Sequence, residues 1–269
     1  MSGFSADWLA LREPHDLRAR SPAVVDAVAA SLEPLTSVRV VDLACGTGAT
    51  LRALSPHLPA QQNWKLIDND LSLLARATAT PIAKHIAIAA IPLDLNRDLE
   101  AALDGPVDLV TTSALLDLVS EIWLDRLAVE IAARSIPLYA ALSYDGRIEF
   151  TPSDPFDTAI VAAVNAHQRT DKGFGPALGP GAAAFAIRRF EALGYSVVHG
   201  ASDWLLRPED REMQTEILAG WASAAHDTGT LPPADSAAWL ARRRATIAAG
   251  RSSLRVGHVD FFATPSAMR

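Results

Sequence analysis

The stretch that most limits how this chain can fold is VRVVDLACGTGAT, residues 38–50. Val38 to Leu43 is a short apolar run rich in valine, which is typical of a strand buried on both faces of a parallel sheet. Two glycines then break the run, and residues 47–58 are expected to form a helix. A strand, a glycine turn and a helix in this order predict the first βα unit of an α/β protein.

The rest of the chain continues this alternation. Further strands are expected at 64–67, 86–93, 107–111, 136–142, 195–199 and 254–263. Helices are expected at 5–33 with a break near Pro14 and a restart at Ser21-Pro22, and at 71–79, 99–103, 120–133, 155–167, 181–193, 209–225 and 234–249. This spacing predicts right-handed crossovers and a doubly wound, mostly parallel sheet of seven strands. The final strand, LRVGHVDFFA, alternates as an antiparallel strand can.

Composition narrows the classes of function. The chain has 269 residues, a net charge of −7 and a single cysteine, Cys45. This length suffices for one large α/β domain with insertions, and the negative charge disfavours a nucleic-acid partner. One cysteine excludes an intramolecular disulfide and a Cys-based zinc cluster, and no His/Asp/Glu cluster has metal-ligand spacing. The chain has no long apolar span, so no membrane-spanning segment is expected. Its N-terminus does not resemble a secretory signal, so a cytoplasmic location is expected.

The residues around the glycine turn discriminate between its possible ligands, which are NAD, ATP and S-adenosylmethionine (SAM). The third glycine of a dinucleotide-binding turn would fall on Leu51, whose bulk argues against NAD. No Gly-Lys-Ser/Thr follows the turn, which excludes a P-loop. Asp42 near the strand end suits a positively charged sulfonium that carries an amino-acid tail and no phosphates. The turn therefore favours SAM.

Here the sequence resembles the class I SAM-dependent methyltransferases, whose first motif runs acidic-x-Gly-x-Gly-x-Gly. Ala44 replaces the first glycine, and the resemblance covers residues 36–144 well. It implies a Rossmann-like α/β fold with SAM as the cofactor. The cofactor-binding residues assigned with it are Arg20, Asp42, Ala44, Gly46, Gly48, Asp68, Asn69, Asp94, Leu95, Ser113 and Asp117.

The resemblance also assigns roles to some of these residues. Asp68 would accept hydrogen bonds from both ribose hydroxyls. Asp70, in the same turn, is the alternative residue for this role. Asp94 would bind the adenine amino group with a backbone contact from Leu95, although it would also serve as a helix N-cap. Arg20 would reach the cofactor carboxylate from an N-terminal helix. Two of these residues have an alternative role that does not involve the cofactor. Asp42 could cap a helix, and Asp117 could be a solvated loop carboxylate.

The acceptor side is expected in the loops after the later strands and in a helical cap. Tyr144 and His167 are the candidate catalytic residues, because an uncharged acceptor must give up a proton and the unperturbed pKa of histidine lies closest to neutral. Arg169, Asp171 and Trp204 are the candidate substrate-binding residues. Each of three residues also has an alternative structural role. His167 could cap the C-terminus of a helix, Arg169 could form surface ion pairs, and Trp204 could pack in the core.

The sequence thus predicts an N-terminal helical segment, residues 1–35, that covers the cofactor. A methyltransferase domain, residues 36–269, follows with cap insertions at about 145–180 and 205–250. The expected function is SAM-dependent methyl transfer to a small molecule. The alternatives are a non-catalytic protein that binds SAM or S-adenosylhomocysteine (SAH), or an NAD(P)-dependent oxidoreductase. Leu51 and the lack of a Tyr-x-x-x-Lys pair disfavour the latter. The acceptor atom and the oligomeric state stay open.

Overall fold

The chain folds around one mixed sheet. The computed structural model describes residues 5–79 and 83–266. Within these residues the sheet has eight strands in the order β3-β2-β1-β4-β5-β8-β6, with the short β7 paired to β8. Neighbours from β3 to β5 are parallel, whereas β8 runs antiparallel to β5 and to β6. The predicted α/β fold with an antiparallel final strand is confirmed.

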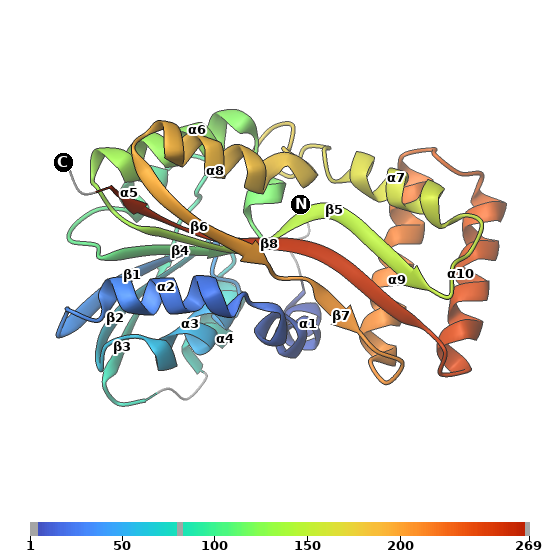
Figure 1. Cartoon of the computed structure of the whole chain (residues 1–269), viewed down its shortest axis with the longest axis horizontal. Coiled ribbons are helices and arrows are strands. Elements are labelled where there is room, and N and C mark those ends of the chain that lie inside the picture. The colour runs from blue at the N-terminus through green and yellow to red at the C-terminus, as the bar shows by residue number, and fades with distance from the viewer. Residues whose placement is uncertain (1–4, 80–82, 267–269) are drawn as a thin grey trace.

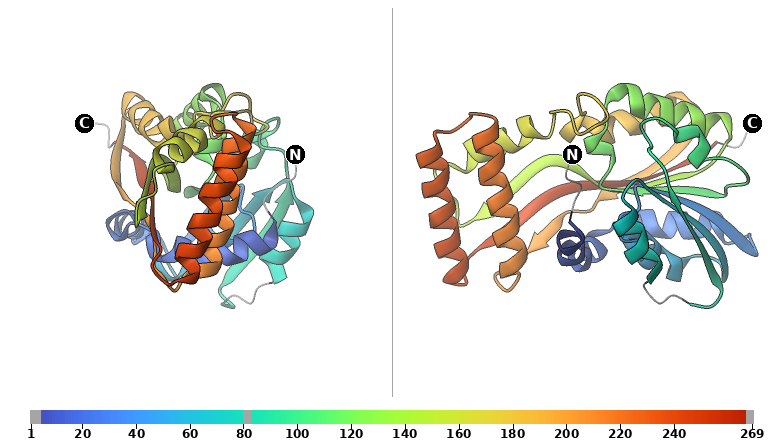
Figure 2. Two further views of the ribbon diagram at one scale, coloured as in Figure 1. Left: turned by 90° about the vertical axis from the view of Figure 1, so that its right-hand side faces the viewer. Right: turned by 180° about the vertical axis from the view of Figure 1, so that it is seen from behind.

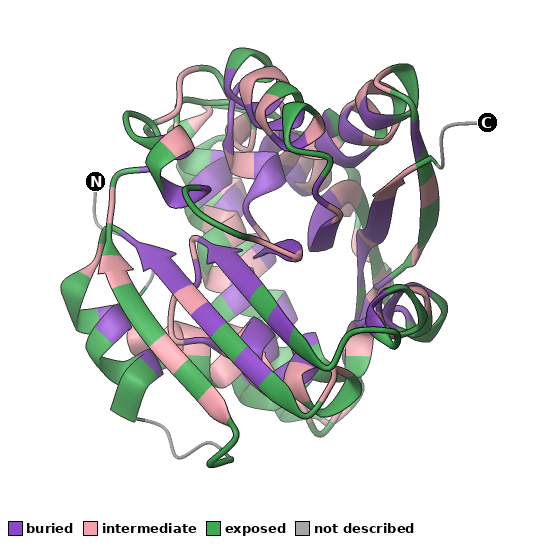
Figure 3. Cartoon of the chain, turned by 90° about the vertical axis from the view of Figure 1, so that its left-hand side faces the viewer, coloured by how far each residue is buried: buried purple, intermediate pink, exposed green. Residues whose placement is uncertain are grey.

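Burial falls from the centre of the sheet to its edge. The strands are β1 (Ser37–Leu43), β2 (Gln61–Asp68), β3 (Ile86–Pro92), β4 (Leu109–Ser113), β5 (Leu138–Thr151), β6 (Tyr195–Ala201), β7 (Trp204–Leu206) and β8 (Ser253–Pro265). Side chains of β4 and of the first half of β5 are almost all buried, whereas no side chain of β3 is fully buried (Figure 3). The carboxyl ends of β1 and β4 therefore lie in the interior, where polar side chains are shielded from water.

Helices cover both faces of the sheet. They are α1 (Ala6–Ala19), α2 (Pro22–Leu32), α3 (Ala49–Leu54), α4 (Leu71–Ala79), α5 (Leu99–Ala102), α6 (Glu121–Ala133), α7 (Asp157–His167), α8 (Ala182–Ala192), α9 (Arg211–Asp227) and α10 (Pro233–Ala248), with short 3₁₀ turns η1 (Ser55–His57), η2 (Leu116–Leu118) and η3 (Gly179–Gly181). One face carries α5, α6 and α8, and the other carries α2, α3 and α4 (Figure 1). None of the described helices has the length and apolar character needed to cross a membrane.

The fifth strand of the chain is much longer than the sequence predicts. The fifth strand was expected to end at Leu142, but β5 continues to Thr151 and pairs with β8 along this extension. Leu142 has a φ of 54° and the pairing register shifts on both sides of Tyr144, so the strand bends without ending. The helices α7, α9 and α10 pack on the extension and on β7, far from the parallel strands (Figure 2).

The predicted break near Pro14 is wrong, because α1 runs without interruption from Ala6 to Ala19. Proline lacks the N–H that would bond the carbonyl of Ala10. Ala10 is exposed, so water can bond this carbonyl and the helix tolerates the loss. The predicted restart is correct, since α2 begins at Pro22 directly after Ser21. The uninterrupted α1 lies between the parallel strands and the helices of the extension (Figure 1).

Candidate cofactor and acceptor site

The glycine turn holds its backbone in conformations that most residues avoid. Ala44, Gly46 and Gly48 have φ angles of 52°, 54° and 81°. A Cβ on Gly48 would lie 3.3 Å from the Cβ of Ala77, so this position has neither the conformational freedom nor the space for a side chain. The N–H of Cys45 donates to the carbonyl of Ile67 at 2.9 Å and fixes the turn to β2. Cys45 is buried, and burial raises the pKa of its thiol, which fits a packing role.

Asp68, at the end of β2, faces the glycine turn. Its Oδ2 accepts the N–H of Gly46 at 2.8 Å, and its Oδ1 accepts the N–H of Asp70 at 3.0 Å. Asp70 instead directly precedes α4, and its Oδ1 accepts hydrogen bonds from the backbone N–H and the hydroxyl of Ser72 at 2.8 and 2.6 Å. These bonds lower the pKa of Asp70. Asn69 between them is exposed. Of the two carboxylates, Asp68 is the one placed at the turn.

Asp42 is a buried carboxylate with one oxygen unused. The hydroxyl of Thr111 donates to its Oδ1 at 2.7 Å, whereas Oδ2 has no hydrogen-bond partner among the described residues. Burial raises the pKa of Asp42 to about 7, and the nearby cation of Arg20 opposes this rise. Arg20 donates to the hydroxyls of Tyr139 at 3.0 Å and of Thr50 at 3.4 Å. Its buried Nε has no partner in the described part of the chain.

The ends of β3 and β4 carry the other predicted cofactor residues. Asp94 is exposed, and its Oδ1 accepts the N–H of Asn96 at 2.9 Å. It is not the helix N-cap that the sequence also allowed, because the N-cap residue of α5 is Asp98. Leu95 is buried, and its carbonyl accepts the indole N–H of Trp123 at 2.8 Å. Ser113 is half-buried at the end of β4.

Asp117 follows β4 on the turn η2 and is only 5% exposed. Its Oδ1 has no hydrogen-bond partner within residues 5–79 and 83–266. Burial raises the pKa of Asp117 to about 6, and the positive charge of Arg12 opposes this effect. The solvated loop carboxylate that the sequence left open is therefore excluded.

Helix α1 covers the glycine turn. A Cβ on Gly46 would lie 3.2 Å from the Cδ1 of Leu9. Farther along the helix, Glu13 accepts a hydrogen bond of 2.7 Å from Arg52 of α3. Both contacts hold α1 against the first βα unit, next to the buried carboxylates.

The next turns of α1 meet the extension of β5 and β8. Arg12 and Asp16 form a buried ion pair at 2.8 Å, and the guanidinium of Arg12 lies 4.9 Å from the ring centre of Trp204. The indole N–H of Trp204 donates to Asp16 at 2.9 Å. The hydroxyl of buried Tyr144 donates to Oδ1 of Asn165 at 2.8 Å, and burial raises its pKa. Tyr144 and Trp204 therefore both lie on the side of α1 that is expected to take the acceptor.

Arg12, Asp16 and His258 also belong to this cluster, and we did not predict them from the sequence. The ring of His258 lies 4.7 Å from that of Trp204 and 6.1 Å from that of Tyr144. Burial lowers the pKa of His258 to about 3, so it is neutral at physiological pH. The spacing of Arg12 and Asp16 by four residues is a readable ion-pair signal on a helix, whereas nothing near His258 in the sequence indicates its neighbours.

His167, Arg169 and Asp171 are placed differently. His167 ends α7 with Lys172 at 3.4 Å and Asp227 at 3.9 Å, and burial together with Lys172 lowers its pKa. Asp171 accepts the N–H groups of two glycines in its own loop, and exposed Arg169 donates to the carbonyl of Asn165 at 2.9 Å. These contacts hold the loop after α7, and the catalytic and substrate-binding roles of the three residues stay predictions. The described residues contain no group of three or more side chains that could hold a metal ion.

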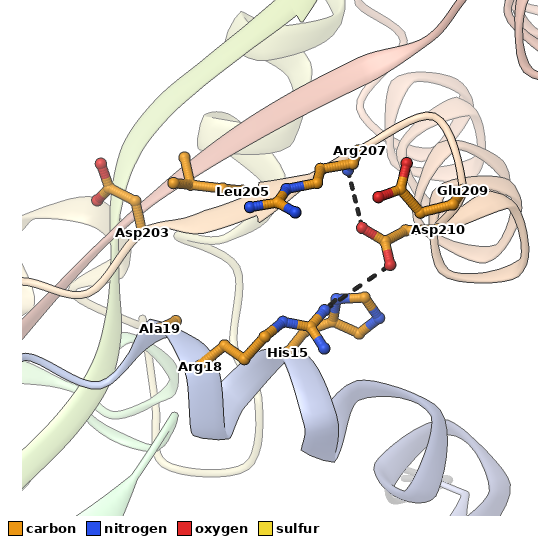
Figure 4. A pocket seen from close by; sticks show the side chains of 8 residues that line it. All are labelled: His15, Arg18, Ala19, Asp203, Leu205, Arg207, Glu209 and Asp210. Carbon is orange, nitrogen blue, oxygen red and sulfur yellow. Dashed lines mark hydrogen bonds and ion pairs between the residues drawn. The ribbon is translucent and has the colours of Figure 1, made fainter. Parts of the chain in front are cut away.

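A charged groove of about 560 Å³ lies on another face of α1, against β7 and the turn after it (Figure 4). Its lining residues are His15, Arg18, Ala19, Asp203, Leu205, Arg207, Glu209 and Asp210. Arg18 lies 2.8 Å from the ring nitrogen of His15 and 3.7 Å from Asp210. Cofactor pockets are mostly apolar with a few polar groups, whereas opposite charges pair with each other here. The groove also lacks the glycine turn, so it is not the candidate cofactor site.

Comparison with known proteins gives matches in structure only. No protein-family profile and no curated protein sequence matches the chain. The cyclopropane synthase MmaA2 from Mycobacterium tuberculosis matches with a TM-score of 0.53 and 10% identity, over 97% of this chain and 94% of that one. A cyclopropane-fatty-acyl-phospholipid synthase-like protein from Lactobacillus casei matches with a TM-score of 0.54 and 13% identity, over 97% and 94%.

The YcgJ protein from Bacillus subtilis matches with a TM-score of 0.50 and 13% identity, over 92% of this chain and all of that one. The similarity extends over nearly the whole length of each protein, so it includes the extension as well as the parallel strands. The strand order and these matches show that the chain has the Rossmann-like fold of the class I SAM-dependent methyltransferases.

Proposed function

We propose that this protein is a SAM-dependent methyltransferase that acts on a small-molecule acceptor. The observation that carries the proposal is a pair of buried, unsatisfied polar atoms beside the glycine turn. Oδ2 of Asp42 and Nε of Arg20 both lack a partner among the described residues. Leaving a buried charged group unpaired is costly, so such atoms call for a ligand that pairs with them.

The residues present fit the proposed cofactor. SAM carries a positive sulfonium, an amino-acid tail, a ribose and an adenine, and it supplies an electrophilic methyl group. Asp42 and Arg20 offer opposite charges to the ends of the tail. Asp68 offers carboxylate oxygens to the ribose hydroxyls from the end of β2, as the carboxylate of a Rossmann-like site does. Asp94 and Leu95 are the proposed adenine contacts.

The small size of the acceptor is inferred from how the site is enclosed. Helix α1 lies over the glycine turn, and the extension of β5 and β8 continues the enclosure on the other side of α1. In this proposal residues 1–35 cover the cofactor, and the helices of the extension form the cap over the acceptor. The net charge of −7 gives no support to a nucleic-acid acceptor.

Thermal unfolding with SAM, SAH, NAD and NADP tests the proposal. A ligand at about 100 times its dissociation constant stabilises the folded state by about 2.7 kcal/mol. For a chain of this size the midpoint should rise by about 5–10 °C. SAM and SAH should produce this rise, and Asp68→Ala should abolish it.

Each alternative gives a different result. A rise with NAD or NADP alone would favour an oxidoreductase, and no rise with any of the four would contradict the proposal. If SAH binds but no SAH forms from SAM with any of a broad panel of amine, alcohol and carbon acceptors, the non-catalytic binding protein becomes the better description.

A further inference from the structure

Asp260 on β8 is a fully buried carboxylate that joins distant segments of the chain. Its Oδ1 accepts the N–H of Leu142 at 2.8 Å, and its Oδ2 accepts the N–H of Ser21 at 3.0 Å. The hydroxyl of Tyr139 also donates to Oδ2, at 3.2 Å. Leu142 lies at the bend of β5 and Ser21 directly precedes α2, so one side chain fixes both places to the final strand.

Tyr139 connects this carboxylate to Arg20. Nη1 of Arg20 donates to the hydroxyl oxygen of Tyr139 at 3.0 Å, and the guanidinium lies 5.7 Å from the centre of the tyrosine ring. Tyr139 is fully buried, and burial raises the pKa of its hydroxyl, so the hydroxyl keeps the proton that it donates to Asp260. The guanidinium, the hydroxyl and the carboxylate thus form one chain of hydrogen bonds with a single direction.

The backbone beside Arg20 is held by the same carboxylate. The N–H of Ser21, the next residue, is one of the donors to Asp260. Gly200 lies opposite Asp260 in the pairing of β6 with β8, and a Cβ at Gly200 would lie 2.4 Å from the Oγ of Ser21. The missing side chain therefore lets the junction of α1 and α2 lie directly on the sheet.

The cation that is held in this way has no negatively charged group as a hydrogen-bond partner in the described part of the chain. Its guanidinium donates to the hydroxyls of Tyr139 and Thr50, which are uncharged, and its buried Nε has no partner among the described residues. A buried cation that bonds only neutral groups suits an anionic ligand. A carboxylate is the anion that a guanidinium binds with the most favourable geometry.

Resting on the methyltransferase function proposed above, we propose that Tyr139 and Asp260 are positioning residues that hold Arg20 against the carboxylate of the amino-acid tail of SAM. Neither residue touches the cofactor. Tyr139 orients the guanidinium, and Asp260 fixes both Tyr139 and the backbone at Ser21. Holding Arg20 in place before the ligand arrives lowers the entropy lost on binding, but only for a ligand that carries the tail.

A ligand without the tail tests this inference. 5′-Methylthioadenosine keeps the adenine, the ribose and the sulfur of SAH but lacks the amino-acid tail. Calorimetry would compare SAH and 5′-methylthioadenosine on the wild type, on Tyr139→Phe and on the control Tyr195→Phe. The control also loses a buried hydroxyl, which donates to the carbonyls of Ile131 and Ile136 at 3.2 and 3.0 Å.

Tyr139→Phe should weaken SAH about tenfold, as expected for loss of a hydrogen bond to a charged group, with little effect on 5′-methylthioadenosine. Tyr195→Phe should change neither affinity. Equal losses for both ligands in Tyr139→Phe would overturn the inference, because a merely structural hydroxyl does not distinguish them. An unchanged affinity for SAH would overturn it too, as would a wild type that binds both ligands equally. A wild type that binds no SAH would instead reject the underlying function.

Two further variants test whether the residues act through Arg20. Arg20→Met removes the guanidinium, so adding Tyr139→Phe to it should weaken SAH no further, whereas additive losses would contradict the chain of hydrogen bonds. Asp260→Asn is nearly isosteric and should show the same selective loss of SAH affinity as Tyr139→Phe. If Asp260→Asn does not fold, the comparison of Arg20→Met with its double variant still decides the matter.

Discussion

Asp42→Asn should make this protein more stable and, at the same time, a weaker binder of SAH. The wild-type carboxylate is completely buried and receives one hydrogen bond, from Thr111. An asparagine has nearly the same shape and still accepts this bond. It removes a buried charge that the unliganded protein leaves half-satisfied.

The magnitude follows from the pKa of Asp42, which is about 7 in the folded protein instead of 3.8. A raised pKa means that the folded state holds the proton more tightly than the unfolded state does, so ionisation destabilises the fold. The penalty is absent below pH 4, grows between pH 4 and pH 7 and is complete above pH 7. For a pKa raised from 3.8 to about 7 its full size is about 4 kcal/mol, which corresponds to a rise of about 8–16 °C in the unfolding midpoint at pH 8.

Urea unfolding of the wild type and Asp42→Asn between pH 4.5 and pH 8 is the assay. The pKa values of Asp117 and His258 also differ between the folded and unfolded states. Both proteins contain these residues, so the difference in unfolding free energy between the two proteins reports on Asp42. This difference should grow with pH in favour of the variant and level off above pH 7. A difference that does not depend on pH, or a variant that is less stable at pH 8, would refute the reasoning.

Three further predictions concern the fold around the site. Gly48→Ala should lower the unfolding free energy by about 1–2 kcal/mol, since it places a Cβ at a φ of 81°. The control Gly181→Ala has open space around the new Cβ and should not lower it, and urea unfolding would measure both variants. Trp239→Ala should cost about 3–5 kcal/mol, because the side chain is fully buried in the cluster of α7, α9 and α10, and a cost below 1 kcal/mol would contradict this packing. Glu13→Gln removes a partly exposed ion pair with Arg52 and should change stability by about 1 kcal/mol or less. The same variant should speed proteolysis within α1, and an unchanged cleavage rate would mean that this pair does not hold the helix.

The parallel part of the fold could be predicted because its signals are local. Apolar runs such as Val38 to Leu43 mark buried strands, and the two glycines mark the turn that follows. Asp68 stands within hydrogen-bond distance of Gly46 because parallel neighbours bring their carboxyl ends to one edge. Reading strand ends in order was therefore sufficient to place these residues.

The acceptor side depends on contacts that sequence patterns do not show. The bend at Leu142 that carries β5 onward is a tertiary feature, so the strand was expected to stop there. Trp204 bonds Asp16 across 188 positions, and His258 packs on the same indole from the far end of the chain. The ion pair of Arg12 and Asp16 was readable but gave no indication of what lay opposite.

A crystal structure of the protein with SAH would show whether the residues around the glycine turn bind the cofactor. We expect the ribose hydroxyls within hydrogen-bond distance of Asp68, the amino-acid tail between Asp42 and Arg20, and α1 over the bound molecule. SAH bound in the charged groove between α1 and β7, or with its ribose on Asp70, would contradict the account.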